Sequence, residues 1–425
     1  MNFYDKRKTM QNQYVDVLFI ASISRIQVNN KNMIIHMKPR IIREGMQWIG
    51  FVDWNRRLFD SLIPLPDGTS YNAYLIQGSD KTALIDAVDP AMAETLRQQL
   101  EGVAKIDYIV AQHAEQDHSG SIPLVLDMYK EAIVLCTPKA KNLLIDHLEI
   151  PAERIQTVSD GETISLGNKT LRFIYMPWVH WPETMVTHLA EDRIVFTCDF
   201  LGSHLAMSGL YAGDDPYVMV AAKRYYAEIM MPFRKAIQGN LKKLREIDFN
   251  LIAPSHGPLW DHPEIIVSAY EDWVSDKVDD LVVIPYISMH GSTEMMVDHL
   301  VAALAERGIT VKKFELTTTD IGKLAMALVD AATIVIGTPT VHMGPHPSVF
   351  SATHLANALR PKLKHAAIIG SYGWGTKVVE HISSLIPNLK VEILGTVLCK
   401  GLPREETFAE LDALADAIQE KHSTL

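Results

Sequence analysis

The chain contains little of several features that mark common classes of protein. Of its 425 residues only three are cysteines, Cys136, Cys198 and Cys399, and no two are close in the sequence. A sparse, odd count argues against a disulfide framework and favours a reducing compartment, here the cytoplasm. It also excludes a Cys-x-x-Cys pair, and with it a rubredoxin-type iron site or a zinc ribbon.

Excess positive charge and long apolar runs are also lacking. The 40 Lys and Arg are outnumbered by 51 Asp and Glu, which gives a formal charge of −11, so there is no basic excess to neutralise nucleic-acid phosphates. The apolar run within residues 16–24 is shorter than the roughly 20 residues of a membrane helix. We expect neither nucleic-acid nor membrane binding.

Residues 1–36 are interpreted as an N-terminal extension that could be disordered. A weak signal peptide is the less favoured alternative.

Two patterns of strands and helices follow one another along the chain, whose 48% apolar content is enough for two cores. Short strands with interspersed helices predict a sandwich of two sheets covered by helices. Strict alternation of strand and helix, which begins near residue 280, predicts a doubly wound parallel sheet. The expected domains are therefore 37–279 and 280–425. The expected strands of the first domain are 46–54, 70–77, 82–87, 107–112, 133–137, 171–176 and 193–198; those of the second are 281–287, 310–315, 333–337, 366–370 and 390–396, with helices over 294–307, 321–331, 376–386 and 405–421.

The densest group of potential metal ligands is the run His113-Ala-Glu-Gln-Asp-His118, which follows a predicted strand. Its spacing cannot place all four side chains on one face of a helix or strand, so we predict a loop. Like charges about 4 Å apart repel by roughly 4 kcal/mol at an effective dielectric near 20, so such a cluster needs a cation. Nitrogen and hard oxygen donors together favour iron, manganese or zinc. A solvated, charged turn is the plain alternative.

Three later segments each add one candidate ligand at a strand end. They are His180 in Trp-Val-His-Trp-Pro, Asp199 after an apolar strand, and His256 in Ser-His-Gly. Each alone is weak, because a single histidine near an apolar run is more often a core or surface residue. Together with the first run they make seven ligands, which are too many for one tetrahedral ion. They are enough for two metals that share a bridging carboxylate.

In this order and spacing the motifs resemble the metallo-β-lactamase superfamily, in its flavodiiron protein (A-type flavoprotein) branch. The common zinc hydrolase pattern has a second histidine where this chain has Glu115, and the added oxygen donor favours iron at that position. The resemblance implies a metallo-β-lactamase-like αββα sandwich, followed by a flavodoxin-like domain. It also implies two iron ions per subunit, one held by His113, Glu115 and His180, the other by Asp117, His118 and His256, with Asp199 as the bridge.

The second domain carries a pattern typical of a flavin site. Ser288-Met-His-Gly-Ser-Thr293 lies between a strand and a helix, where backbone N–H groups and hydroxyls can cradle a phosphate, although the same residues could simply cap the helix. Two further loops follow parallel strands, and in a flavodoxin-like fold the cofactor lies at those strand ends. FMN is favoured over FAD because the chain has no dinucleotide-type glycine fingerprint. The expected contacts are Ser288, Met289, His290, Gly291, Ser292, Thr293, Thr338, Pro339, Thr340, Ser371, Tyr372, Gly373 and Trp374.

The resemblance implies an oxidoreductase that reduces dioxygen to water, nitric oxide to nitrous oxide, or both. Electrons are expected to pass from an external donor (a rubredoxin, a flavin reductase or reduced F420) to FMN and then to the diiron site of the partner subunit. That transfer implies a head-to-tail homodimer or a homotetramer, in which Trp374 reaches toward the partner's metals. Two alternatives stay open: a zinc-dependent hydrolase fused to a flavodoxin, and a flavodoxin-like electron carrier whose first domain is only a dimerisation scaffold.

Overall fold

The computed structural model describes residues 37–425, and the prediction for residues 1–36 lies outside them. Lys38–Leu425 form one compact unit, so the predicted division near residue 280 stays a prediction. Every helix within the described residues is too short or too polar to span a membrane.

The first half of the described chain is a sandwich of two β-sheets. Tyr74 of one sheet packs against Phe196 of the other, with ring centroids 4.9 Å apart. The first sheet has the strand order β1 (Arg40–Arg43), β2 (Met46–Asp53), β5 (Thr69–Gln77), β6 (Thr82–Ile85), β7 (Tyr108–Val110), β8 (Ile133–Cys136) and β9 (Ile155–Thr157). The second has the order β10 (Thr163–Ser165), β11 (Thr170–Tyr175), β12 (Met185–Leu189), β13 (Ile194–Cys198) and β14 (Leu251–Pro254). A separate hairpin is formed by β3 (Leu58–Phe59) and β4 (Ile63–Pro64).

Helices cover the outer face of each sheet, as the αββα prediction requires. Leu96, Val125 and Leu144 pack from helices onto the first sheet, and Leu241 and Tyr270 pack onto the second. The helices of the first layer are η1 (Pro90–Met92), α2 (Ala93–Gln99), α3 (Gln116–Ser119), α4 (Ile122–Met128), α5 (Pro138–Leu148) and η2 (Ala152–Arg154). Those that follow the second sheet's β13 are α6 (Pro216–Tyr225), the π-helical turn η3 (Tyr226–Met230), η4 (Met231–Phe233), α7 (Arg234–Arg245) and α8 (Pro263–Val274).

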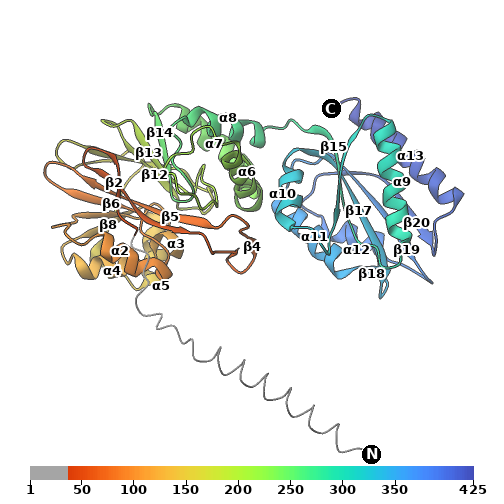
Figure 1. Ribbon diagram of the computed structural model, residues 1–425, viewed down its shortest axis with the longest axis horizontal. Coiled ribbons are helices and arrows are strands. Elements are labelled where there is room, and N and C mark those ends of the chain that lie inside the picture. The colour runs from red at the N-terminus through yellow and green to blue at the C-terminus, as the bar shows by residue number, and fades with distance from the viewer. Residues whose placement is uncertain (1–36) are drawn as a thin grey trace, which may run out of the picture. The chain divides into compact units, whose positions relative to one another are not determined.

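The C-terminal half is a parallel sheet with helices on both faces (Figure 1). The ladders between neighbouring strands on the main path are all parallel. Their order, in which the first strand lies between the second and the third, is that of a flavodoxin-like fold. The order is β16 (Thr310–Glu315), β15 (Asp279–Tyr286), β17 (Ala331–Val341), β19 (His365–Tyr372) and β20 (Glu392–Lys400), and the short β18 (Gly344–Pro345) pairs with β17. One face is covered by α9 (Ser292–Glu306) and α13 (Glu405–His422), the other by α10 (Ile321–Asp330), α11 (Pro347–Leu359) and α12 (Val378–Leu385).

The predicted architecture is confirmed, but several predicted elements are wrong in detail. The run 113–118 is a loop only as far as Glu115, because α3 begins at Gln116 and carries the next two ligands. The predicted strand 333–337 continues through Pro339 to Val341, because Thr340 and Val341 pair with β18. Strands β12 and β14 and helix α11 were not predicted. All residues of the two strands are buried, and polar and apolar residues do not alternate along them. Such alternation is the usual sequence signal of a strand.

Candidate functional site

All seven predicted metal ligands lie together at one edge of the β-sandwich. The loop after β7 supplies His113 and Glu115, and the one-turn helix α3 supplies Asp117 and His118. The remaining three follow β11, β13 and β14. The last of these turns depends on Gly257, whose φ is +78° and where a Cβ would lie 2.1 Å from Oγ of Ser203. Only glycine fits there, and it lets the chain reverse directly after His256.

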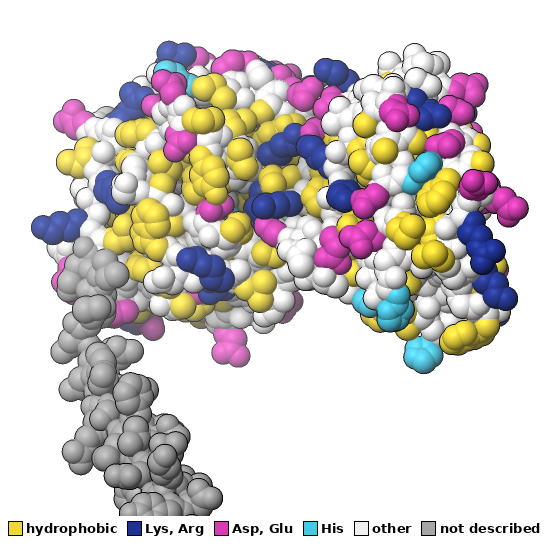
Figure 2. Space-filling model, turned by 45° about the vertical axis from the view of Figure 1, so that its right-hand side comes forward, with side chains coloured by type: hydrophobic (Ala, Val, Ile, Leu, Met, Phe, Trp, Pro, Cys, Tyr) yellow, Lys and Arg dark blue, Asp and Glu magenta, His cyan; other side chains and the backbone are white. Residues whose placement is uncertain are grey.

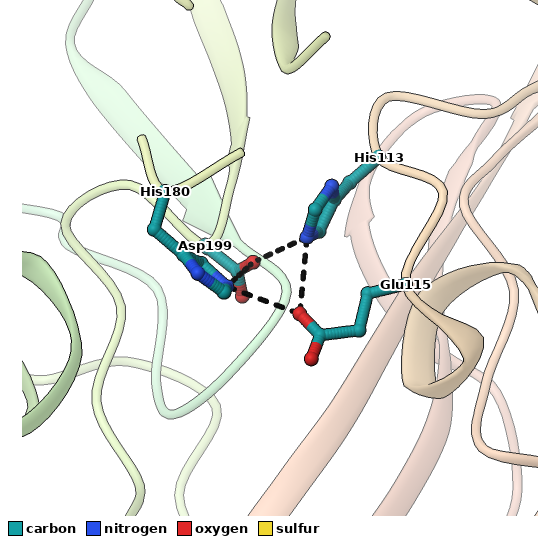
Figure 3. Close-up of side chains that lie close together, drawn as sticks. All are labelled: His113, Glu115, His180 and Asp199. Carbon is teal, nitrogen blue, oxygen red and sulfur yellow. Dashed lines mark hydrogen bonds and ion pairs between the residues drawn. The ribbon is translucent and has the colours of Figure 1, made fainter. Parts of the chain in front are cut away.

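The first group of ligand atoms is formed by His113, Glu115, His180 and Asp199 (Figure 3). Oε2 of Glu115 lies 3.1 Å from Nε2 of His113 and 3.0 Å from Nε2 of His180. Oδ2 of Asp199 lies 3.5 Å from each of the same two nitrogens. Two imidazole nitrogens and two carboxylate oxygens therefore converge on one point.

A second group shares Asp199 with the first. The other oxygen of this carboxylate, Oδ1, lies 3.0 Å from Nε2 of His118 and 3.3 Å from Nε2 of His256. Asp117 completes the group, with Oδ2 at 3.1 Å from Nε2 of His256. Because one oxygen of Asp199 faces each group, its carboxylate has the geometry of a bridge between two metals.

The buried carboxylates of the site favour the binding of positive charge. Burial lowers the pKa of His180 and of His256, but the neighbouring carboxylates outweigh burial and raise these pKa values to about 9 and about 10. Burial alone would raise the pKa of Asp199, yet the surrounding histidines hold it well below its ordinary value. The pKa of Glu115 is lowered by His113 and His180 in the same way. A metal cation can take the place of the protons that these pairs share.

Several ligand atoms are buried without a well-formed hydrogen bond. Both carboxylate oxygens of Asp117, Nε2 of His118 and Oδ2 of Asp199 are in this state, although each lies within 3.5 Å of another ligand. Buried polar atoms normally have partners, so such a cluster needs an explanation. Atoms aimed at a common centre, and not at one another, are what metal ligands require. This donor set fits a pair of iron ions.

Residues that support the ligands were not predicted. The Tyr225 hydroxyl donates to Oδ1 of Asp199 at 2.9 Å, and the His204 ring lies 4.8 Å from that of His256. Asp86 is buried beside His118, and burial raises its pKa although it accepts hydrogen bonds from Gln112. No local sequence signal marks these positions, because each of them contacts a ligand that lies far from it along the chain.

A second site lies at the carboxyl ends of the parallel strands, where a hollow of about 340 Å³ opens. Oγ of Ser288 accepts a hydrogen bond from the N–H of Glu294 at 3.1 Å, which places the loop over the first turn of α9. The volume of the hollow is within the range of small-molecule pockets. The predicted contacts that line it are Ser288, Met289, His290, Ser292, Pro339, Thr340, Ser371, Tyr372 and Gly373.

Four other predicted contacts do not line this hollow. The Thr338 side chain, within β17, is fully buried, and its Oγ1 accepts a hydrogen bond from the N–H of His346. The Thr293 hydroxyl binds that of Ser371 at 3.0 Å, behind the lining. Gly291 is not among the lining residues, and the Trp374 side chain is 91% exposed. Gly401 and Leu402 line the hollow but were not predicted; their position after β20, at the same sheet edge, was the available signal.

Comparison with known proteins gives matches over both halves of the chain. Residues 69–257 match the family model described as "ODP family beta lactamase". The nitric oxide reductase of Moorella thermoacetica is 35% identical over 366 residues, which are 84% of this chain and 92% of that protein.

Two solved structures are similar to the fold as a whole. The rubredoxin oxygen:oxidoreductase of the anaerobe Desulfovibrio gigas has a TM-score of 0.87 and 27% identity, and the match covers 91% of this chain and 99% of that one. The flavodiiron protein of Giardia intestinalis has a TM-score of 0.83 and 27% identity, with 91% and 98% covered. The likeness therefore extends through both sheets of the sandwich and through the parallel sheet.

Proposed function

Because this chain belongs to the flavodiiron protein family, we propose that it is an oxidoreductase that reduces dioxygen to water, nitric oxide to nitrous oxide, or both. The observation that carries this proposal is the pair of His–carboxylate groups that share Asp199. Two metals held by these two groups would be able to bind a diatomic molecule between them. The proteins similar to this chain include both a nitric oxide reductase and a rubredoxin oxygen:oxidoreductase.

We assign one iron to His113, Glu115 and His180 and the other to Asp117, His118 and His256, with Asp199 bridging. The convergence of these side chains and their buried, unpaired atoms support the assignment. FMN is assigned to the hollow beside α9. The helix N-terminus and the hydroxyls of Ser288 and Ser292 suit its phosphate.

The two cofactors supply the electrons: a reduced diiron pair and a reduced FMN hold two each, and dioxygen needs four electrons and four protons to give two waters. Two nitric oxide molecules need two electrons and two protons to give nitrous oxide and one water. The protein itself binds the metals and shields them from solvent. The ligand side chains are buried, and His180, the most exposed of them, is only 15% exposed, which limits the access of water to the site.

The proposal also covers the electron donor, the compartment and the assembly. A rubredoxin, a flavin reductase or reduced F420 can each serve as donor, and we place the protein in the cytoplasm. A head-to-tail homodimer, or a homotetramer built from two such dimers, is supported by apolar side chains at and beside the hollow. Met289, Trp374 and Leu402 are 51%, 91% and 61% exposed, and exposed apolar clusters of this kind favour contact with another surface. On the face seen in Figure 2, acidic, basic and apolar side chains are interspersed.

Metal and flavin analysis of the natively purified protein tests the proposal first. We expect two irons and one FMN per chain. Anaerobic stopped-flow of the fully reduced protein against dioxygen, and separately against nitric oxide, then measures which gas reoxidises it. Two zinc ions and no iron per chain would overturn the proposal and favour the zinc hydrolase.

A further inference from the structure

Behind the ligand His113 lies a buried carboxylate that belongs to none of the metal-binding groups. Nδ1 of His113 donates to Oε1 of Glu183 at 2.7 Å, and both side chains are 0% exposed. The opposite ring nitrogen, Nε2, faces Glu115 and Asp199. The imidazole is therefore held between the outer carboxylate and the candidate iron.

The position of Glu183 is fixed by several independent contacts. Its Oε1 also accepts from the backbone N–H of Ala114 at 3.1 Å, and its carbonyl oxygen accepts from the hydroxyl of Thr137 at 2.9 Å. The ring of Trp181 meets that of His113 edge-on, with centroids 4.9 Å apart. These contacts leave one orientation for the His113 ring, in which Nδ1 carries the proton and Nε2 is free to bind metal.

The outer surroundings of the other candidate histidines differ: Asp86 is buried beside His118 and accepts hydrogen bonds from Gln112 and Ser255. Nδ1 of His256 donates to a neutral acceptor, the carbonyl oxygen of Ser70, at 2.6 Å. The ion pairs of His180 involve Nε2, on its metal-facing side. Glu183 thus places a hydrogen-bonded carboxylate directly behind a ligand of the first metal group.

We propose that Glu183 is a positioning residue that orients His113 and lowers the reduction potential of the iron that His113 binds. A carboxylate behind a ligand histidine increases the basicity of the imidazole, and removal of such a partner typically costs 10–100-fold in metal affinity. An anion near the metal also stabilises the ferric form over the ferrous form. The inference rests on the proposed function, because it requires that the site binds iron.

The test compares Glu183→Gln, Glu183→Asp and Glu183→Ala with the wild-type holoenzyme. Glutamine keeps the shape and an acceptor oxygen but removes the charge. Glu228→Gln is the matched control, since Glu228 is also a buried carboxylate, paired with Arg224 away from the ligands. Iron loss to an excess of chelator is followed optically, and the midpoint potentials of the diiron pair are measured by redox titration.

We expect Glu183→Gln to lose iron from one site 10–100-fold faster than the wild type, and its potential to shift to more positive values. A tenfold change in the ferric-to-ferrous preference equals about 59 mV. Glu183→Asp should recover part of both effects, and Glu228→Gln should match the wild type. Glu183→Ala should show the largest loss of iron.

The outcomes separate this inference from the proposed function. If the wild-type protein binds no iron, the proposed function fails, and the inference fails with it. If the wild type binds two irons and Glu183→Gln has the same iron-loss rate and the same potentials, only the inference is overturned. If the potentials stay unchanged while the iron-free variants melt below the iron-free wild type, Glu183 has only a structural role, which also overturns it.

Discussion

At position 115 the chain carries a glutamate where zinc hydrolases of the same superfamily have a second histidine. Its Oε2 lies within 3.1 Å of Nε2 of both His113 and His180, so the side chain points into the first metal group. The substitution replaces a neutral nitrogen donor by a charged, hard oxygen donor. Affinity order alone favours zinc over iron, and ligand type must therefore select the metal.

We expect Glu115→His to shift the metal content from iron toward zinc. The variant restores the histidine-rich donor set and removes one negative charge from the first group. Elemental analysis of protein produced with equal iron and zinc in the medium measures the ratio. Glu131→His, on an exposed residue, is the control and should keep the wild-type ratio. An unchanged ratio in Glu115→His would show that Glu115 does not select the metal.

Single residues also show what the sequence could and could not predict. The convergence of the seven candidate ligands was predicted because their segments follow strand ends and because their types and order suggest a metal site. Glu183 and Asp86 have no such mark, since a lone acid in the sequence does not reveal that it is buried against a histidine. Their roles depend on contacts between segments distant in the chain, which only the fold brings together.

At the scale of elements, the N-terminus of α9 is the proposed site of the FMN phosphate. Gly291 precedes the helix with φ of +86°, and Ser292 is its first residue. Free N–H groups at this end attract a phosphate through hydrogen bonds and the helix dipole. The sequence predicted this helix and its loop well, because turn residues lie directly between an apolar strand and an amphipathic segment.

We expect Ser292→Asp to weaken FMN binding at least tenfold. The new carboxylate would itself occupy the helix N-terminus and repel the phosphate. Titration of flavin-free protein with FMN, followed by the quenching of flavin fluorescence, measures the affinity. Ser384→Asp, on the exposed surface of α12, should bind FMN as the wild type does. Equal FMN affinity of Ser292→Asp and the wild type would show that the FMN phosphate does not bind at the N-terminus of α9.

The π-helical turn η3 contains a carboxyl group whose ionisation the fold opposes. Burial raises the pKa of Glu228 from 4.5 to about 7, although Arg224 lowers it. The folded chain therefore holds this proton over a pH range in which the unfolded chain releases it. Stability contributed by the neutral carboxyl is present below pH 4.5 and is lost as the pH rises toward 7.

We expect the free energy of unfolding of the iron-free protein to fall between pH 4.5 and 7 by at most about 3 kcal/mol on account of Glu228. Glu228→Gln has no proton to lose, so its stability relative to the wild type should rise over the same interval. Urea unfolding at pH 5 and at pH 7.5 measures both proteins. A constant difference between them would contradict the raised pKa.

At the scale of the whole molecule, the two sites lie at the ends of different sheets. The metal groups lie at an edge of the β-sandwich, and the hollow lies at the carboxyl ends of the parallel strands. The sequence predicted both architectures because each has its own pattern of strands and helices along the chain. It could not predict the continuation of β17 through Pro339, since proline usually ends a strand and the pairing partner β18 is only two residues long.

A head-to-tail dimer makes a specific prediction for mixtures of inactive subunits. His113→Ala should remove a metal ligand but leave FMN in place, and Ser292→Asp should do the reverse, so each homodimer lacks one of the two cofactors. In a mixed dimer, the FMN of the first variant lies beside the intact metal groups of the second. Random assembly should then restore about a quarter of the wild-type rate, because half of the dimers are mixed and each of these has one complete pair of sites.

Co-expression of the two variants with different affinity tags isolates the mixed dimer, and gas consumption with a saturating reductant measures its rate. If electrons passed from FMN to iron within one subunit, neither chain of the mixed dimer would be complete and no activity would return. Combining both substitutions in one chain and pairing it with a wild-type chain is the control. Transfer between subunits leaves that dimer without a complete pair of sites, whereas transfer within a subunit leaves it half active. The two dimers contain the same substitutions and differ only in their distribution, so a general loss of stability cannot produce opposite outcomes.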